Sequence, residues 1–352
     1  MKLLQILYPG LGGHSSVATS LISGDKENVF EHFLLGYGIE KPSENLKSYK
    51  LDYVIKRKGI DLRSFKKVYD SISKTKPDAI ILHSTSQIFT VFVYSLFHKI
   101  KWVAVEHQAN NAKNKVDWLY SFFILLLSPR IIYLTDFYKK EMQSRFSLLS
   151  KFKKISVIGN GVDLNRFVPK EKDKDDFFNI SMISRFNKLR DHETLIRSFS
   201  QVLKTNFQAR LIIAGEGETF GYIKNLCVVL NIQDKVSLLG FVNESQIIDL
   251  LQKSDLYVHS SLAETQSTSL LQVMACKVPI VATNINGINT LFSDGIDANL
   301  FEPGDIFGLT NIINKLIEDN ETRVFLRNNS ETKVNTHYSA VKMFEKYKDF
   351  LI

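Results

Sequence analysis

The residues from 260 to 283 place an acidic side chain directly before the expected start of a helix. Glu264 lies in a polar turn, and the hydroxyls of Ser267 and Thr268 suit the residue that caps a helix N-terminus. Apolar residues at helical spacing follow them. A carboxylate beside the free N–H groups of a helix start suits a ligand that is anionic at one end and hydroxylated at the other, such as a nucleotide sugar. The residues alone also allow a core helix with a solvated loop before it.

Glycines mark two further turns, each after an expected strand. Gly12 and Gly13 open the first expected helix, where a doubly wound domain places its ligand, and without a Cβ they would let the backbone approach a phosphate or an acceptor. Gly215 and Gly217 follow a strand in the second half. Neither turn has the full spacing of a dinucleotide fingerprint. We therefore expect tight strand-to-helix turns rather than a dinucleotide cofactor.

The sequence does not favour a metal or redox site. Asp173-Lys174-Asp175 matches the Asp-x-Asp of metal-dependent sugar transferases, but it lies in the charged run 169–176. We interpret that run as an interdomain linker, in which metal ligands would not be preorganised. Cys227 and Cys276 fall in separate helical patterns, which argues against a disulfide framework and a zinc site. We expect no cofactor and no required divalent metal.

Positive charge is concentrated in the first half of the chain. The whole chain has 352 residues and a net charge of +8. Residues 1–165 hold 24 Lys and Arg against 14 Asp and Glu, whereas the remainder holds 21 against 23. The basic clusters of the first half could face anionic lipid or an acidic acceptor, or could simply be solvated. Nucleic acid is a weaker alternative, because no nucleic-acid motif accompanies the charge.

Short apolar segments alternate with amphipathic ones along the whole chain, which predicts an α/β protein with parallel sheets. The expected strands are 3–8, 29–35, 79–83, 102–106, 131–134, 155–158, 177–183, 210–214, 236–239, 256–258 and 280–282. The expected helices are 15–22, 62–74, 88–98, 116–127, 136–146, 191–203, 222–230, 245–252, 268–276, 307–319, 322–329 and 338–351. The apolar stretch within the first nine residues is too short for a signal peptide. The apolar run 118–127 is too short to span a bilayer, so we expect a cytoplasmic protein.

Five segments in order resemble glycosyltransferase family 4, the retaining nucleotide-sugar enzymes of GT-B fold. They are 157–167, with Asn160-Gly161-Val162-Asp163, then 184–196, 211–217, 239–242 and 264–279. The likeness is dense from about residue 155 to 305 and thinner before it. Each motif alone is modest, but five in the correct order are specific.

The resemblance implies two facing Rossmann-like domains with a cleft between them. Residues 1–165 would bind the acceptor, residues 166–335 would bind the nucleotide sugar, and the helix in 336–352 would return to the first domain. The enzyme would be a metal-independent hexosyltransferase that moves a sugar from an NDP-sugar, UDP favoured over GDP, to a glycan or lipid-linked acceptor. Bacterial capsule, O-antigen or lipopolysaccharide synthesis would be its setting, with peripheral contact at the inner face of the membrane. A GT-B nucleotide-sugar epimerase and a non-catalytic partner subunit remain the alternatives.

The resemblance also implies roles for individual residues. Arg185 and the residue five later would hold the diphosphate; the family usually has Lys there, and this chain has Arg190, with Lys188 nearby. Glu264 would accept hydrogen bonds from hydroxyls of the donor sugar. The second acidic residue of the family, which holds the ribose hydroxyls, is replaced by Gln272. An amide offers one acceptor and one donor in place of a charged acceptor, so we expect weaker nucleotide binding by about 1–2 kcal/mol.

The remaining site residues follow from the same resemblance. His107, after the strand 102–106, would face the reacting sugar, unless it is a satisfied structural histidine; His83 is a weaker candidate on the acceptor side. The other residues expected to contact the nucleotide sugar are Gly12, Gly13, Gly215, Val242, Thr265, Gln266, Ser267 and Thr268.

Overall fold

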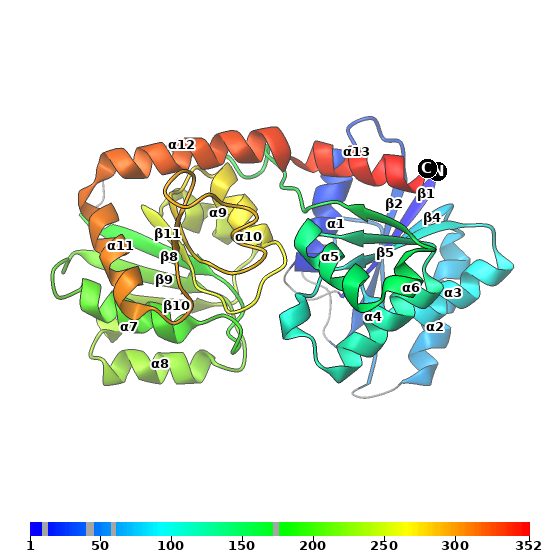
Figure 1. Cartoon of the computed structure of the whole chain (residues 1–352), viewed down its shortest axis with the longest axis horizontal. Coiled ribbons are helices and arrows are strands. Elements are labelled where there is room, and N and C mark those ends of the chain that lie inside the picture. Colours follow the sequence, from blue (N-terminus) through cyan, green and yellow to red (C-terminus); the bar gives the residue numbers. More distant parts are fainter. Residues whose placement is uncertain (9–12, 40–45, 58–60, 172–175) are drawn as a thin grey trace. The chain divides into compact units, whose positions relative to one another are not determined.

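The computed structural model describes residues 1–8, 13–39, 46–57, 61–171 and 176–352. The chain forms two compact units, Met1–Asp163 together with Tyr338–Ile352, and Leu164–His337 (Figure 1). Each unit contains one parallel β-sheet with helices packed on it. The predicted α/β class with two parallel-sheet domains is confirmed.

The first unit is built on a seven-stranded sheet of order β3-β2-β1-β4-β5-β6-β7. Its strands are β1 (Lys2–Leu7), β2 (Glu31–Gly38), β3 (Leu51–Ile55), β4 (Ala79–Leu82), β5 (Lys101–Glu106), β6 (Arg130–Tyr133) and β7 (Lys154–Val157). Its helices are α1 (Gly13–Gly24), α2 (Leu62–Thr75), α3 (Ile88–Phe97), α4 (Lys115–Leu127), α5 (Asp136–Arg145), α6 (Ser147–Ser150) and α13 (Ala340–Leu351). Successive residues of β4 point to opposite faces of the sheet. Ile80 packs in a cluster with α2, α3 and α4, and Ile81 packs in another with α1 and α13, so both faces are covered.

The second unit has a six-stranded sheet of order β10-β9-β8-β11-β12-β13. Its strands are β8 (Phe178–Ile183), β9 (Ala209–Ala214), β10 (Val236–Gly240), β11 (Leu256–His259), β12 (Ile280–Thr283) and β13 (Asn299–Phe301). Its helices are α7 (His192–Val202), α8 (Phe220–Val229), α9 (Glu244–Gln252), α10 (Thr268–Ala275), α11 (Ile306–Glu318) and α12 (Asn320–His337). In both sheets the chain reverses its strand order, between β1 and β4 in the first and between β8 and β11 in the second. Ligands of such sheets bind at this reversal, outside the carboxyl ends of the strands.

The last helix, α13, belongs to the first unit and packs against α1 (Figure 1). Ser339 caps its N-terminus by accepting a hydrogen bond from the Lys342 N–H at 3.2 Å. Phe344 and Tyr347 enter the apolar cluster beneath β1 and β4. The first residue of the helix also bonds to the chain after β7, since the Ala340 N–H donates to the Val162 carbonyl at 2.8 Å. This cap explains why the helix begins at Ala340 and not at residue 338 as expected.

The sequence analysis missed two strands and the short helix α6, and it misjudged the extent of another helix. β3 is an edge strand with only Val54 buried, so it lacks the apolar run that marks a buried strand. β13 has three residues. We expected a helix over 322–329, but α12 continues to His337; its last turns are polar, and Ser330 and Val334 are its buried residues there. Among the described residues, no helix has the length and apolar character needed to cross a bilayer.

The contact between α1 and α13 predicts a strong effect of adding one methyl group. A Cβ on Gly24 would collide with the Ala340 carbonyl and the Phe344 Cβ. We expect Gly24→Ala to lower the free energy of unfolding of the first unit by about 1–3 kcal/mol, measured by urea denaturation. Gly221→Ala in α8 is the matched control, because no atom lies within 4 Å of that Cβ position. The control should be unchanged or more stable, and equal stability of Gly24→Ala would contradict the packing described.

Candidate functional site

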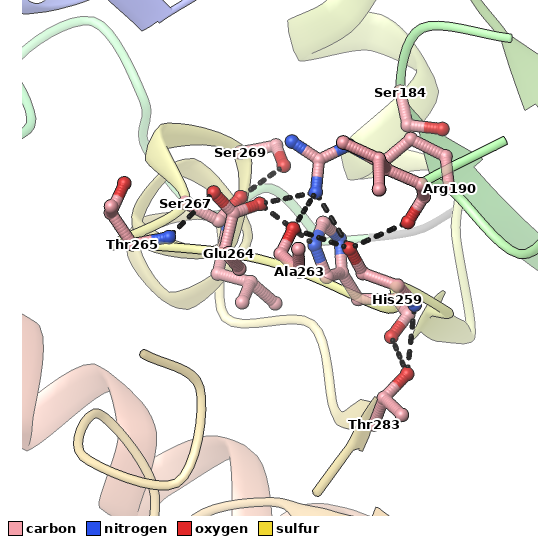
Figure 2. A network of polar contacts seen from close by, with 12 residues as sticks. Ser184, Arg190, His259, Ala263, Glu264, Thr265, Ser267, Ser269 and Thr283 are labelled. Carbon is pink, nitrogen blue, oxygen red and sulfur yellow. Dashed lines mark hydrogen bonds and ion pairs between the residues drawn. The ribbon is translucent and has the colours of Figure 1, made fainter. Parts of the chain in front are cut away.

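A buried ion pair lies at the carboxyl edge of the second sheet. Glu264 is 8% exposed in the loop between β11 and α10. Its Oε2 lies 2.7 Å from the Nη1 atom of Arg190, which precedes α7 (Figure 2). Its Oε1 accepts a hydrogen bond from the Thr265 N–H at 3.2 Å. The sequence analysis assigned these two residues to different parts of one ligand, the diphosphate and the sugar, and the structure shows that they contact each other directly.

Further hydrogen bonds fix the Arg190 side chain and its turn. Arg190 Nη1 also donates to Ser261 Oγ at 2.7 Å and to the Ala263 carbonyl at 3.1 Å. The Leu262 N–H donates to the Leu189 carbonyl at 2.8 Å, which ties the loop after β11 to the turn after β8. The Arg190 side chain remains 24% exposed. The guanidinium is thus anchored through one of its nitrogens while part of it faces solvent.

The surroundings of Glu264 keep its carboxyl group ionised. Burial raises the pKa, but the Arg190 charge and the His259 imidazole outweigh burial and lower the pKa to about 2. Such a carboxylate accepts hydrogen bonds and donates none at neutral pH. It is therefore suited to bind hydroxyl groups of a ligand.

His259 is a site residue that the sequence analysis missed. It ends β11, is 1% exposed, and places Nε2 3.5 Å from Glu264 Oε2 (Figure 2). Burial lowers its pKa, so the imidazole is neutral and the contact is not an ion pair. His192 was missed as well; it contacts Ser184 Oγ at 2.9 Å and stacks on Phe186 with ring centroids 4.2 Å apart. The available signal was the position of these histidines beside strand and helix ends.

Helix α10 begins at Thr268, where the sequence predicted a helix start. Ser267 caps it by accepting a hydrogen bond from the Leu270 N–H at 3.4 Å, and its hydroxyl also contacts Ser269 Oγ at 2.8 Å. Thr265, Gln266 and Ser267 are all buried. Gly287, with a φ of +95°, packs against this loop, and a Cβ there would collide with the carbonyls of Glu264 and Thr265.

The other predicted residues of the second unit follow the carboxyl ends of its strands, except Gln272, which lies within α10. Arg185 and Lys188 are exposed in the turn between β8 and α7. Gly215 has a φ of +143° and approaches the Ser184 carbonyl, so this glycine is required by a close backbone contact. Val242 lines a cavity of about 310 Å³ between the end of β10 and α9. Gln272 is 7% exposed in α10.

The first unit carries the remaining predicted residues. His107 follows β5, and its Nε2 lies 2.8 Å from Nδ1 of His83, which follows β4. Gly13 begins α1, with open space around the position of a Cβ. Gly12 and the Asp-x-Asp at Asp173 and Asp175 lie outside the described residues. In the described part of the chain, no group of three or more His, Cys, Asp or Glu could hold a metal ion.

Both halves of the chain match models of known glycosyltransferase families. The model described as "Glycosyltransferase Family 4" matches residues 12–166, and that described as "Glycosyl transferases group 1" matches residues 163–333. An Escherichia coli UDP-Gal:alpha-D-GlcNAc-diphosphoundecaprenol alpha-1,3-galactosyltransferase is 27% identical over 83% of this chain and 79% of its own length. A Campylobacter jejuni N-acetylgalactosamine-N,N'-diacetylbacillosaminyl-diphospho-undecaprenol 4-alpha-N-acetylgalactosaminyltransferase is 26% identical over 98% of this chain and 91% of its own.

Solved structures share the fold over the whole chain. Anabaena HepE, solved with UDP and glucose, has a TM-score of 0.82 at 18% identity and covers 100% of this chain and 99% of its own. TarM of S. aureus has a TM-score of 0.83 at 14% identity, covering 100% of both chains. These likenesses confirm the predicted GT-B fold.

The ion pair predicts a pH-dependent cost for removing the guanidinium. In Arg190→Met, Glu264 would be buried without its cation, so we expect a loss of about 3–5 kcal/mol of unfolding free energy at pH 7. In the native protein the lowered pKa of Glu264 stabilises the fold above the unfolded pKa near 4.5, and that stabilisation is lost as pH falls towards 2. In the variant burial instead raises the pKa of Glu264. The difference in unfolding free energy between the native protein and Arg190→Met, measured by urea denaturation, should therefore be smaller at pH 4 than at pH 7.

Arg197→Met is the matched control, because Arg197 pairs with Glu193 on the surface of α7, where both side chains are about two-fifths exposed. Arg197→Met should lose about 0.5 kcal/mol of unfolding free energy at both pH values. A deficit of Arg190→Met that is independent of pH would contradict the account of Glu264.

Proposed function

Because this chain belongs to the GT-B glycosyltransferases of family 4, we propose that it transfers a sugar from a nucleoside diphosphate sugar to a glycan or lipid-linked acceptor, with retention of anomeric configuration. The observation that carries the proposal is the buried, ionised Glu264 beside Arg190 at the strand reversal of the second sheet. The Escherichia coli and Campylobacter relatives are named for transfer to diphosphoundecaprenol-linked acceptors. We therefore favour bacterial surface polysaccharide synthesis, and a UDP-sugar over a GDP-sugar.

The cations of the turn between β8 and α7 would support the leaving group. Negative charge grows on the diphosphate as its bond to the sugar breaks, and fixed donors aimed at it lower the barrier. Arg185 and Lys188 are exposed in that turn. Arg190 uses Nη1 for Glu264, but a guanidinium has five donor N–H groups, so its exposed part could still bind a phosphate oxygen. With three cations there, we propose that no divalent metal is required.

Glu264 and Gln272 would read the hydroxylated parts of the donor. The ionised Glu264 would accept hydrogen bonds from sugar hydroxyls, and Arg190 would hold it in place. Gln272, in the family position for the ribose, has one acceptor and one donor on its amide, so it would bind one ribose hydroxyl by accepting and one by donating. Gly215, Val242 and the N–H groups from Thr265 to Thr268 would complete the nucleotide-sugar site.

Substitution of Arg185 tests the proposed reaction. We expect Arg185→Ala to lower kcat by about 100-fold to 1,000-fold with little change in the melting temperature, because its charge would act on the departing diphosphate. Release of UDP or GDP from a panel of nucleotide sugars, with lipid-linked and soluble acceptors and with EDTA present, is the measurement. Lys224→Ala, an exposed lysine of α8, is the control and should keep full activity.

Other results of that assay would replace the proposal. An active Arg185→Ala enzyme would remove the role given to the arginine. Turnover of the donor without an acceptor, giving an epimerised sugar, would identify an epimerase. Absence of nucleotide binding and transfer with every donor would indicate a non-catalytic partner subunit, and activity that EDTA abolishes would show a metal requirement.

We further propose that the first unit contacts an anionic membrane through the outer face of α3, α4, α6 and the segment after α6. Large apolar side chains stand exposed on these neighbouring elements: Phe89, Val93, Leu96, Phe97, Val116, Leu119, Leu126, Leu148 and Phe152. The spacing of Phe89, Val93, Leu96 and Phe97 puts them on one side of α3. The rings of Phe89 and Phe123 meet with centroids 4.7 Å apart, which joins that side to α4.

Charge complementarity argues for lipid as the occupant of this face. Lys99, Lys115 and Lys151 are exposed and lie next to these apolar residues in the sequence. The acidic residue of α4, Asp117, is occupied in capping, where it accepts hydrogen bonds from the Asn114 N–H at 3.0 Å and from Gln108 Nε2 at 2.9 Å. Apolar anchors combined with basic side chains are typical of a surface that lies on anionic lipid headgroups.

Vesicle flotation tests this face. We expect Leu96→Glu/Phe97→Glu to lower binding to phosphatidylglycerol vesicles at least tenfold, since two exposed apolar anchors become acidic. Phe207→Glu, at a residue 71% exposed in the second unit, is the control and should float like the native protein. Equal flotation of all three proteins would contradict the proposal, as would a dimer in light scattering that the double variant dissociates.

A further inference from the structure

Three histidines and a glutamine gather where the strand order of the first sheet reverses. Gln5 lies on β1, His83 directly follows β4 and His107 directly follows β5. His14, in the first turn of α1, places its ring centroid 4.5 Å from that of His107. Gln5 and His83 are both 0% exposed. A buried amide and a buried imidazole are costly in a sheet interior unless they are hydrogen-bonded.

The hydrogen bonds define where the protons lie. Gln5 Nε2 donates to the Ala18 carbonyl at 3.3 Å, which turns its Oε1 towards His83. Because Oε1 can only accept, His83 Nε2, at 3.1 Å, must carry the proton of that ring. A neutral His83 then has an unprotonated Nδ1. His107 Nε2, 2.8 Å from that Nδ1, must therefore donate to it.

Both imidazoles are neutral in this environment. Burial, together with the nearby His14, lowers the pKa of His83 to about 3. Burial, His14 and His83 hold the pKa of His107 well below its usual value. A neutral imidazole that carries its proton on Nε2 has a lone pair on Nδ1, and that atom accepts hydrogen bonds. The direction of the chain from Ala18 through Gln5 and His83 thus decides which nitrogen of His107 accepts.

We propose that Gln5 and His83 are positioning residues that hold His107 with its proton on Nε2, so that Nδ1 accepts a hydrogen bond from a hydroxyl of the bound sugar. The sugar as ligand rests on the proposed function, whereas the position of the proton does not. An apolar pair would fill the same interior without dictating a tautomer. This series of hydrogen bonds therefore explains why Gln5 and His83, two polar side chains that packing alone does not require, are buried there.

Nitrogen NMR of histidine tests the position of the proton without any substrate. In protein labelled with ¹⁵N-histidine, we expect His107, assigned with a His107→Gln variant, to show a protonated Nε2 and an unprotonated Nδ1 at pH 7. Gln5→Met removes the acceptor that fixes His83, so His107 should shift partly to the other tautomer. Gln5→Glu places a carboxylate beside His83 that favours a proton on both of its ring nitrogens, so His83 Nδ1 should donate and His107 should take the tautomer protonated on Nδ1. His107 protonated on Nδ1 in the native protein, or unchanged in Gln5→Met, would overturn the proposal.

Titration with the nucleotide sugar tests the role of Nδ1. The Nδ1 resonance of His107 should move on binding of the donor and not on binding of UDP alone. In the transfer assay, kcat/KM for the donor should fall at least tenfold in both Gln5→Met and Gln5→Glu, whereas with a purely structural role the loss would follow the melting temperatures of the two variants. Donor binding that leaves Nδ1 unmoved would overturn the acceptor role. Absence of transfer by the native protein would reject the proposed function and leave the tautomer measurement to stand.

Discussion

The second unit depends on a carboxylate that is kept charged inside the protein. Burial alone would protonate Glu264, and Arg190 prevents this from 2.7 Å away. The guanidinium gains its position from bonds to Ser261 and the Ala263 carbonyl, which belong to the same loop as the carboxylate. The turn after β8 and the loop after β11 are therefore fixed as one structure, and a ligand would meet an ordered site rather than order it.

This arrangement requires the parallel sheet. The turn that carries Arg190 follows β8, and the loop that carries Glu264 follows β11; these strands are neighbours although more than seventy residues separate the two side chains. Strand order reverses between them, so their connections diverge and leave the strand ends accessible. The first sheet repeats the arrangement at β1 and β4, where Gln5 and His83 meet. Each unit thus places its polar network at the corresponding edge of the sheet.

Local patterns predicted the two parallel sheets and the start of α10, but not how the side chains at the sheet edge pair. Alternating apolar segments were sufficient for the two parallel sheets, and Ser267 and Thr268 for the start of α10. The edge strand β3 was not predicted, because its residues are mostly exposed and lack an apolar run. The contact of Arg190 with Glu264 and the burial of His259 arise from segments far apart in the sequence, so no spacing encodes them. Gly287 shows the same limit, since its need for a glycine comes from the Glu264 loop.

The two networks fix protonation by opposite means. Arg190 and Glu264 form an ion pair that keeps the carboxylate ionised. Gln5, His83 and His107 are neutral, and their network fixes only the direction of its hydrogen bonds. In the proposed reaction the diphosphate gains negative charge, which cations near it stabilise, while the sugar carbon becomes electron-poor. If His107 binds the sugar as proposed, a cationic imidazole there would oppose the positive charge that grows on the sugar carbon, and a neutral acceptor would not. The burial that lowers the pKa values of His83 and His107 therefore suits the proposed role of these neutral histidines in orienting the sugar.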